Sequence, residues 1–344
     1  MGFRGTIVTY AKETVFDYNT KVVHDFGIEK NTNADKGLCP NIEIWRQGVH
    51  ETIEMLGEGD QLAIKTTGAG PVVTDALAAG DPLPKQMFDA LRDISLHCKR
   101  RQVRILIDAE SQAYQGGILK AGLDLMREFN RDGYALVYNT YQAYLKNATS
   151  TIEHHLKAAF DENFTLGLKL VRGAYLATEQ RSLICDTKKD TDNAYNAIAH
   201  GALRRQIGNI GAEGCTPFPS VNLMLCGHNK ESVFSSYELH QQRLKDGLST
   251  VPVGFAQLHG MTDAVSFGLL RLGSFNDSKP EVYKCSTWGS VTECLGYLTR
   301  RALENKDAAG RTLDEYVALK LEAKRRLASF LFPYSQRSPK GITK

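Results

Sequence analysis

The chain has 344 residues, of which 42% are hydrophobic and 24% are charged, and this composition is typical of a globular protein with a full hydrophobic core. Its 42 basic and 39 acidic residues are interleaved and leave a net charge of +3, which argues against a nucleic-acid partner. The longest apolar runs have the length of strands, so we expect no integral membrane segment.

Eight short runs rich in Val, Ile and Leu alternate with helical patterns along the chain. We predict strands at Gly5–Tyr10, Gln61–Thr66, Val103–Ile107, Ala135–Asn139, Leu166–Val171, Ser220–Leu225, Gly254–Leu258 and Glu281–Cys285. Helical patterns include Lys85–Lys99, Gly117–Phe129, Leu145–Glu162, Asp192–Ile207 and Val291–Asn305. Eight strand–helix units indicate an α/β protein of the (β/α)8 TIM-barrel type, with a doubly wound open sheet as the alternative.

Two segments interrupt this alternation. The polar segment Asn19–Glu51 is interpreted as a loop leading into a helix around Ile42–Leu56. The charged segment Arg311–Phe332 has helical periodicity and is expected to form a C-terminal helical extension packed on the barrel. We therefore expect one domain over residues 1–335 and a disordered tail over 336–344.

The seven cysteines form no CxxC pair and no cluster with histidines. This pattern predicts reduced thiols and no metal site. Met1 leads directly into a predicted strand, and the expectation from this start is that the given sequence carries no signal or transit segment. The expected location is the cytoplasm, or the mitochondrion if a leader is missing from this chain.

Polar side chains follow most of the predicted strands, where barrels of this type carry their functional groups. The residues at or just after the strand ends are Lys65, Asp108, Asn139, Lys169 with Arg172, His228 with Asn229, Leu258 and Cys285. Lys65 opens the run KTTGAGPV, which is a weak match to a dinucleotide fingerprint because the third glycine is missing. Since Pro71 interrupts the start of a helix there, we interpret the run as a loop. We interpret His228 either as a structural residue held by a hydrogen bond or as a residue that contacts a cofactor.

Lys169 lies within an apolar predicted strand, where an unpaired ammonium group would be costly to bury. It could form an ion pair with Asp108, belong to a cationic wall for an anionic cofactor, or act as a Schiff-base nucleophile. Gly173 follows and would let the backbone approach a ligand closely.

The last predicted helix of the alternation carries the pair Arg300 and Arg301. Its apolar residues Val291, Leu295, Leu298 and Ala302 recur at helical spacing and are expected to face the barrel. The arginine pair is either a solvated helix end or a bidentate site for a carboxylate or phosphate, and the two interpretations stay open.

Together these runs resemble the proline dehydrogenase family of flavoenzymes. Their sequences look most like those of the fungal members. The segments that carry the resemblance are LIDAESQAY (106–114), VYNTYQAYLK (137–146), LGLKLVRGAYLATEQR (166–181), CGHN (226–229), QLHGM (257–261) and WGSVTECLGYLTRRALEN (288–305). They occur in the family's order and cover nearly the whole chain.

The resemblance implies a barrel that binds FAD and oxidises proline by hydride transfer to flavin N5. Its implied partners are a small cyclic amino acid and an electron acceptor, a quinone or oxygen, that the sequence does not specify. By position it implies substrate or catalytic roles for Lys65, Asp108, Lys169, Tyr175, Leu258, Cys285, Tyr297, Arg300 and Arg301. It implies cofactor contacts at Asn139, Gln142, Lys169, Arg172, Gly173, Ala174, Lys188, His228, Asn229 and Glu304.

Cys285 departs from the family pattern, which has a tyrosine at this position against the substrate ring. A smaller side chain opens volume there, which favours a substituted cyclic imino acid such as hydroxyproline. Alternatively, a neighbour such as Trp288 refills the volume and proline is still used. Two other functions stay open: a Schiff-base aldolase or lyase on the same barrel, and a flavin-binding relative without turnover.

Overall fold

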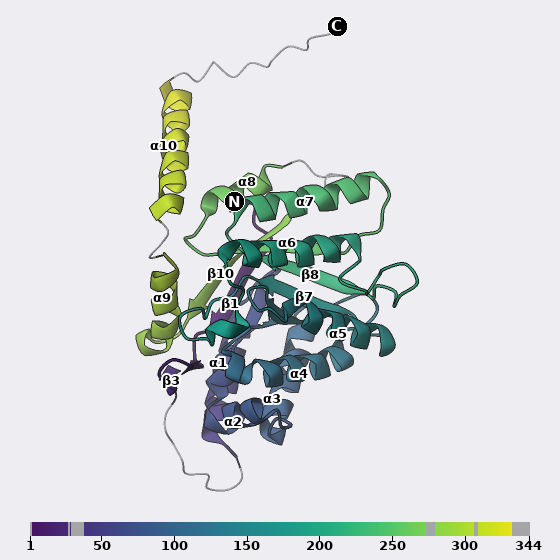
Figure 1. Cartoon of the computed structure of the whole chain (residues 1–344). Helices are drawn as coiled ribbons and strands as arrows, with labels where there is room; N and C mark the ends of the chain where they lie inside the picture. Colours follow the sequence, from purple (N-terminus) through teal and green to yellow (C-terminus); the bar gives the residue numbers. More distant parts are fainter. Residues whose placement is uncertain (1, 27, 29–37, 273–278, 306–308, 332–344) are drawn as a thin grey trace.

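The computed structural model describes residues 2–26, 28, 38–272, 279–305 and 309–331 (Figure 1). The side chains of 304–305 and 309–315 lie outside this description, as does the predicted tail 336–344.

Eight parallel strands close into a barrel in the order β1-β10-β9-β8-β7-β6-β5-β4. Their bounds are β1 Gly5–Tyr10, β4 Gln61–Ile64, β5 Arg104–Ile107, β6 Val137–Gln142, β7 Leu166–Val171, β8 Val221–Cys226, β9 Val253–Leu258 and β10 Glu281–Trp288. All eight predicted strands are confirmed within a few residues, and closure of β1 onto both β10 and β4 excludes the open sheet.

Helices cover the outside of the barrel (Figure 1). The described helices are α1 Pro40–Met55, α2 Pro71–Ala79, α3 Lys85–Arg100, α4 Gln112–Phe129, α5 Ala148–Asp161, α6 Lys188–Arg204, α7 Lys230–Lys245, α8 Asp263–Leu270, α9 Val291–Asn305 and α10 Ala309–Leu331. None of the helices in the described part of the chain is both long and apolar enough to cross a membrane.

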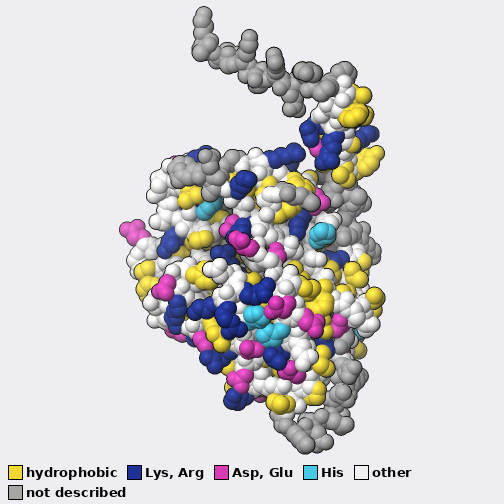
Figure 2. Space-filling view, turned by 180° about the vertical axis from the view of Figure 1, so that it is seen from behind, with side chains coloured by type: hydrophobic (Ala, Val, Ile, Leu, Met, Phe, Trp, Pro, Cys, Tyr) yellow, Lys and Arg dark blue, Asp and Glu magenta, His cyan; other side chains and the backbone are white. Residues whose placement is uncertain are grey.

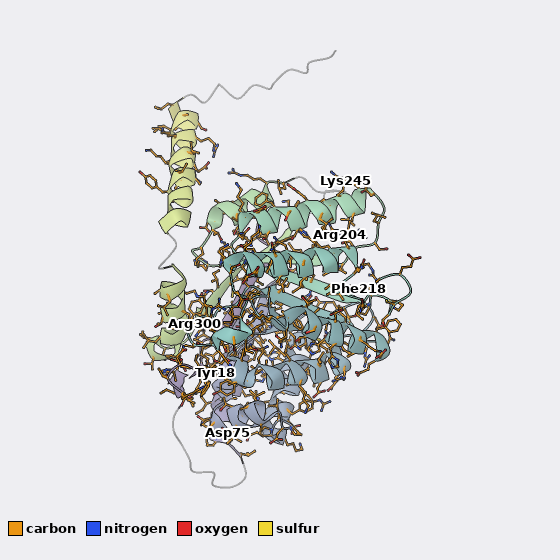
Figure 3. All side chains as sticks on the ribbon, viewed as in Figure 1. Tyr18, Asp75, Arg204, Phe218, Lys245 and Arg300 are labelled. Carbon is orange, nitrogen blue, oxygen red and sulfur yellow. The ribbon has the colours of Figure 1, made fainter. Side chains whose placement is uncertain are left out.

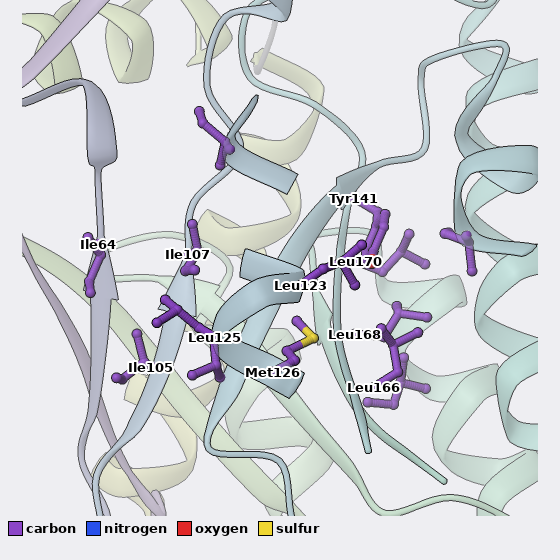
Figure 4. Close-up of a cluster of buried hydrophobic side chains, with 14 of the residues drawn as sticks. Ile64, Ile105, Ile107, Leu123, Leu125, Met126, Tyr141, Leu166, Leu168 and Leu170 are labelled. Carbon is purple, nitrogen blue, oxygen red and sulfur yellow. The ribbon is translucent and has the colours of Figure 1, made fainter. Parts of the chain in front are cut away.

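The strands bury side chains on both faces because each is covered by helices outside and by its neighbours inside. Leu166, Leu168 and Leu170 of β7 join the outer core, which also contains Ile105 and residues of α4 (Figure 4). The alternate residues point inward and fill the barrel with a second cluster. It consists of Ile7, Ala63, Leu106, Ala135, Tyr138, Met224, Ala256 and Tyr283. This two-residue alternation decides which strand-end residues can reach the mouth of the barrel.

Two expectations about loops are wrong. Residues after Asn19 do not form only a loop, because β2 (Glu13–Asp17) and β3 (Val22–Phe26) form an antiparallel hairpin. Pro71 does not prevent a helix, because it occupies the first turn of α2, where the missing N–H has no intrahelical partner to lose.

The C-terminal helices also differ from expectation. On α9 the apolar face points to solvent: Val291, Leu295 and Leu298 are about half exposed or more. The helix of the C-terminal extension is confirmed, but α10 projects from the barrel (Figure 1) instead of packing on it along its length. Its described apolar side chains, such as Leu319 and Phe330, are exposed. Figure 2 shows hydrophobic and basic side chains side by side on this projecting helix.

Candidate active site

Three charged side chains meet inside the carboxyl-terminal end of the barrel. Asp108, after β5, accepts from Lys169 Nζ of β7 at Oδ1 (2.6 Å). Its Oδ2 lies 3.5 Å from Nζ of Lys65, which follows β4. Burial acts to raise the pKa of the Asp108 carboxyl, but the two ammonium groups outweigh it and hold the pKa below its usual value. The Lys169–Asp108 ion pair considered from the sequence is present.

Glu13 is a member of this cluster that the sequence reasoning missed. Its side chain is fully buried, and its Oε2 lies 3.0 Å from Nζ of Lys65. Burial acts to raise its pKa, but Lys65 and Arg300 outweigh it, so the pKa is lowered. The signal available in the sequence was the β-branched runs Glu13–Asp17 and Val22–Phe26 around a polar turn, which are typical of a hairpin.

Arg300 extends the cluster from α9, whose place at the edge of the barrel is marked in Figure 3. Its Nη1 donates to Glu13 Oε1 (2.5 Å), and its guanidinium lies 4.9 Å from the ring centre of Tyr175. The Arg301 guanidinium lies over the ring of Tyr297, one turn earlier on α9 (5.2 Å). The polar face of α9, not its apolar stripe, therefore faces the mouth of the barrel.

Gly296 allows α9 to approach the hairpin this closely. A Cβ at Gly296 would lie 2.8 Å from the ring of Phe26 and 2.9 Å from Glu13 Oε1. Since real side chains do not tolerate such contacts, a larger residue here would push Arg300 away from Glu13.

Leu258 and Cys285 are neutral residues of β9 and β10 in the same part of the barrel as the charged cluster. They are register partners: Leu258 ends β9, whereas β10 continues past Cys285 to Trp288, and Cys285 packs on the inner core cluster. Burial raises the pKa of the Cys285 thiol to about 11, although Lys169 acts against the shift. The thiol is thus neutral at physiological pH and lies near the charged cluster.

The turn after β4 that carries Lys65 is held by the buried carboxyl of Glu110. Its Oε1 accepts from the backbone N–H groups of Thr66 (2.8 Å) and Thr67 (3.2 Å) and from the Thr66 hydroxyl (3.0 Å). The Thr67 hydroxyl also bonds to Glu110. Burial raises the pKa of Glu110 to about 7.

Glu110→Gln keeps one acceptor oxygen for the Thr66 and Thr67 groups and removes the charge, which makes it a test of that raised pKa. Because the folded pKa lies above the usual 4.5, the wild-type protein loses stability as the pH rises from about 4.5 through 7. We expect the variant to gain stability relative to wild type at pH 8.5, on the order of 3 kcal/mol, and little at pH 4.5. Urea unfolding at both pH values measures this; the exposed Glu58→Gln is the control, and an equal effect at both values would contradict the assignment.

Several residues implied for the cofactor lie around the ends of β6, β7 and β8. Gln142 is buried and its amide lies 3.5 Å from the backbone oxygen of Glu110. Arg172 donates from Nε to Asp192 (2.7 Å) and from Nη2 to Ser232 (2.9 Å), while its buried Nη1 has no hydrogen-bond partner among the described residues. Lys188 is exposed but pairs with the same Asp192 (2.5 Å).

Gly173 and Ala174 lie in the connection that follows β7. Gly173 has a φ of 140°, and a Cβ there would lie 2.6 Å from the Tyr144 ring. Its lack of a side chain is therefore required by the packing of Tyr144. Ala174 is half-buried beside it.

Other implied cofactor residues are placed differently. The Asn139 amide donates to the Leu119 oxygen of α4 (2.9 Å), so it points away from the charged cluster, and its cofactor contact stays a prediction. Asn229 caps α7 by accepting from the Ser232 N–H, and His228 accepts from the Leu258 N–H through Nε2 (3.1 Å). Glu304 lies outside the described side chains.

A hollow lies at the end of the barrel opposite the charged cluster. It encloses about 440 Å³ and is lined by residues near the amino ends of the strands, among them Arg4, Gln61, Arg104, Glu281 and Tyr283. Active sites of this fold lie at the carboxyl ends, so the charged cluster is the candidate site. Within the described residues, no group of three or more His, Cys, Asp and Glu side chains is arranged to hold a metal ion.

Comparison with known proteins agrees with the sequence resemblance. A probable mitochondrial proline dehydrogenase of Schizosaccharomyces pombe is 34% identical over 71% of this chain and 50% of its own length. A hydroxyproline dehydrogenase of Rattus norvegicus is 34% identical over 69% of this chain and 51% of its own length. The chain thus spans about half the length of these relatives.

A solved structure also shares the fold. Proline utilization A from Bdellovibrio bacteriovorus, inactivated by N-propargylglycine, superposes with a TM-score of 0.65 over 90% of this chain and 30% of its own, at 17% identity. The model of the family described as proline dehydrogenase matches residues 13–313, which include the hairpin, the charged cluster and α9. The chain therefore belongs to the proline dehydrogenase family.

Proposed function

We propose that residues 1–335 form one catalytic domain, an FAD-dependent dehydrogenase that oxidises proline or a substituted proline to the corresponding pyrroline carboxylate. The observation that carries this proposal is the network of ion pairs that brings together the cations Lys65, Lys169 and Arg300. The neutral residues Leu258 and Cys285 of β9 and β10 lie in the same part of the barrel. Cations suit the substrate carboxylate, and apolar walls suit its ring.

The residues present fit a flavin dinucleotide. The buried Nη1 of Arg172 has no described partner, although Nε and Nη2 fix the guanidinium in place, which suits a phosphate or another anionic acceptor. Gln142 and Lys169 supply polar groups inside the barrel. When bound, FAD supplies the hydride acceptor; the protein binds, orients and surrounds it. Asn139 and Asn229 stay in the proposed set with less support, because their side chains hydrogen-bond to α4 and α7.

The charges of the lysines disfavour the Schiff-base alternative. Burial acts to lower the pKa of Lys169, but Asp108 outweighs it and raises the pKa. The pKa of Lys65 is raised in the same way by Glu13 and Asp108. A Schiff-base nucleophile needs a neutral amine at working pH, and the site stabilises the ammonium form instead.

The substrate proposed is one with a ring substituent, such as hydroxyproline. Trp288 does not refill the space beside Cys285, because its indole N–H donates to the Thr52 hydroxyl of α1 (2.9 Å) and its ring packs on Tyr10. A thiol at this position, in place of a tyrosine ring, supports a substrate that carries extra bulk near the charged cluster. The name of the rat relative supports the same class of substrate.

Cys285→Tyr restores the bulk that the family pattern places here. We expect the ratio of kcat/KM for proline to that for 4-hydroxyproline to rise by about 10-fold or more, because a ring and hydroxyl would occupy the substituent's space. Steady-state kinetics on both substrates measures the ratio. Cys294→Tyr, on α9, is the control and should leave it unchanged; an unchanged ratio in Cys285→Tyr itself would contradict the pocket argument.

Anaerobic flavin bleaching tests the function as a whole. Full-chain protein loaded with FAD should show a flavin spectrum that bleaches on addition of proline or 4-hydroxyproline. Protein that takes up no FAD would overturn the proposal. Flavin that binds but is bleached by no cyclic amino acid would favour the relative without turnover, and borohydride trapping of a carbonyl substrate on Lys169 would favour the aldolase.

We propose that the electron acceptor is a quinone or oxygen. Each can be added in turn to the protein with bleached flavin. Of the two locations considered, the mitochondrion is favoured by the name of the S. pombe relative.

A further inference from the structure

A compact group of histidines and carboxylates lies between α1 and α3, outside the barrel. His50 and Glu54 are four residues apart on α1, and Asp93 and His97 are four residues apart on α3. Residues with this spacing share one face of a helix. Each histidine reaches across to the carboxylate of the other helix: His50 Nε2 lies 2.9 Å from Asp93, and His97 Nε2 lies 3.2 Å from Glu54.

The remaining ring nitrogens converge on each other. Nδ1 of His50 lies 3.1 Å from Nδ1 of His97, with ring centres 5.3 Å apart. A carboxylate only accepts hydrogen bonds, so each Nε2 is expected to carry the proton and donate it. Both Nδ1 atoms then present lone pairs to each other. Two lone pairs at this distance repel unless a proton or a metal ion lies between them.

The distance between the two nitrogens is compatible with two ligands on one metal ion. Zinc–imidazole bonds are about 2.0–2.1 Å long, so two nitrogens at roughly tetrahedral to right angles on one ion lie about 2.9–3.4 Å apart. Metal-binding histidines commonly donate their other N–H to a carboxylate, which fixes the tautomer and raises the basicity of the ligand. His50 and His97 each have such a carboxylate partner.

The carboxylates are themselves held by arginines. Arg46 Nη1 donates to Asp93 (3.1 Å) while binding Glu43, and Arg101 Nη1 donates to Glu54 (3.0 Å). The histidine side chains keep 23% and 20% of their surface exposed, so an ion and its water ligands can reach the nitrogens from solvent.

We propose that His50 and His97 form a surface binding site for a zinc-class divalent ion, bound through their Nδ1 atoms and completed by water, which joins α1 to α3. With two protein ligands it is weaker than a structural zinc site. The site is separate from the proposed flavin and substrate site, but α1 also supports that site, since the Trp45 N–H donates to the Lys65 oxygen (2.8 Å).

Zn²⁺ titration of tag-free, FAD-loaded full chain, stripped of metal beforehand, tests this proposal by calorimetry and thermal unfolding. We expect one equivalent to bind and the Tm to rise with Zn²⁺ concentration. His97→Gln should abolish both effects, whereas His154→Gln, at an exposed position on α5, should leave them intact. Asp93→Asn keeps both ligands and should weaken Zn²⁺ binding by about 10- to 100-fold.

Cu²⁺ gives a readout independent of stability. Its EPR spectrum should show hyperfine splitting from two nitrogens in the wild type and from one in His50→Gln. Binding of Zn²⁺ that survives in His50→Gln and His97→Gln would overturn the proposal. A second result would also overturn it: ¹⁵N signals of the two imidazole rings that titrate with pH as a pair sharing one proton and that do not change when Zn²⁺ is added.

Discussion

Asp108→Ala is expected to destabilise the protein by about 3–5 kcal/mol, because it removes a buried carboxylate and leaves buried charge behind. Lys169 and Lys65 both pair with Asp108, and both ammonium groups are buried. Lys65 keeps Glu13 in the variant, whereas the described hydrogen bonds and ion pairs of Lys169 involve only Asp108. The midpoint of urea unfolding measures the loss.

The matched control for Asp108→Ala is Asp161→Ala. Asp161 pairs with Lys157 at a similar distance, 2.7 Å, but both side chains are about half exposed. Exposed pairs contribute about 0–1 kcal/mol, so the control should change little. Equal losses in the two variants would show that burial of the Asp108 pairs does not carry the effect.

The Asp108 contribution also has a defined pH dependence. Its folded pKa lies below the usual value near 4, so the stabilisation is present above about pH 4 and is lost as the pH falls through the folded pKa. The difference in stability between the wild type and Asp108→Ala should therefore shrink in acid.

Arg300→Lys is expected to lower kcat/KM for the cyclic amino acid by on the order of 10- to 100-fold, chiefly through KM. Lysine keeps the charge but loses the planar fork and the contact with the Tyr175 ring, which lies 4.9 Å from the guanidinium. Arg300 already pairs with Glu13. The substrate carboxylate would therefore bind the remaining N–H donors of the Arg300 guanidinium or would compete with Glu13 for it. A single ammonium group cannot serve two carboxylates as a guanidinium can.

Arg325→Lys is the control for this variant, since Arg325 forms an exposed pair with Glu322 on α10. It should leave the kinetic constants unchanged. A KM that is the same in wild type and Arg300→Lys would remove Arg300 from the proposed carboxylate site. A fall in kcat alone would assign it to a later step than binding.

The barrel and its charged cluster could be predicted from the sequence for a local reason. Each strand is a short run that must be buried on both faces, so its composition marks it without reference to the rest of the chain. The alternation that places Leu166, Leu168 and Leu170 in the outer core also places Lys169 inside the barrel. A buried ammonium group needs an acidic partner, and Asp108 is that partner.

Other parts of the site depend on contacts between segments far apart in the sequence. Asn139 ends a predicted strand like the others, but the observed β6 continues to Gln142, and Asn139 faces α4 on the outside. Glu13 lies 287 residues from Arg300, and only the hairpin brings the two together.

The sequence by itself determined the eight-strand barrel, the lysines and aspartate at its mouth, and membership of the proline dehydrogenase family. The tertiary structure decided which face of each element meets the site. The apolar stripe of α9 predicted burial toward the barrel, yet the mouth of the barrel is charged, so the face with Arg300 turns inward and Leu295 and Leu298 remain exposed. Periodicity identifies the two faces of a helix, but the chemistry of the surface it meets selects the one that is buried.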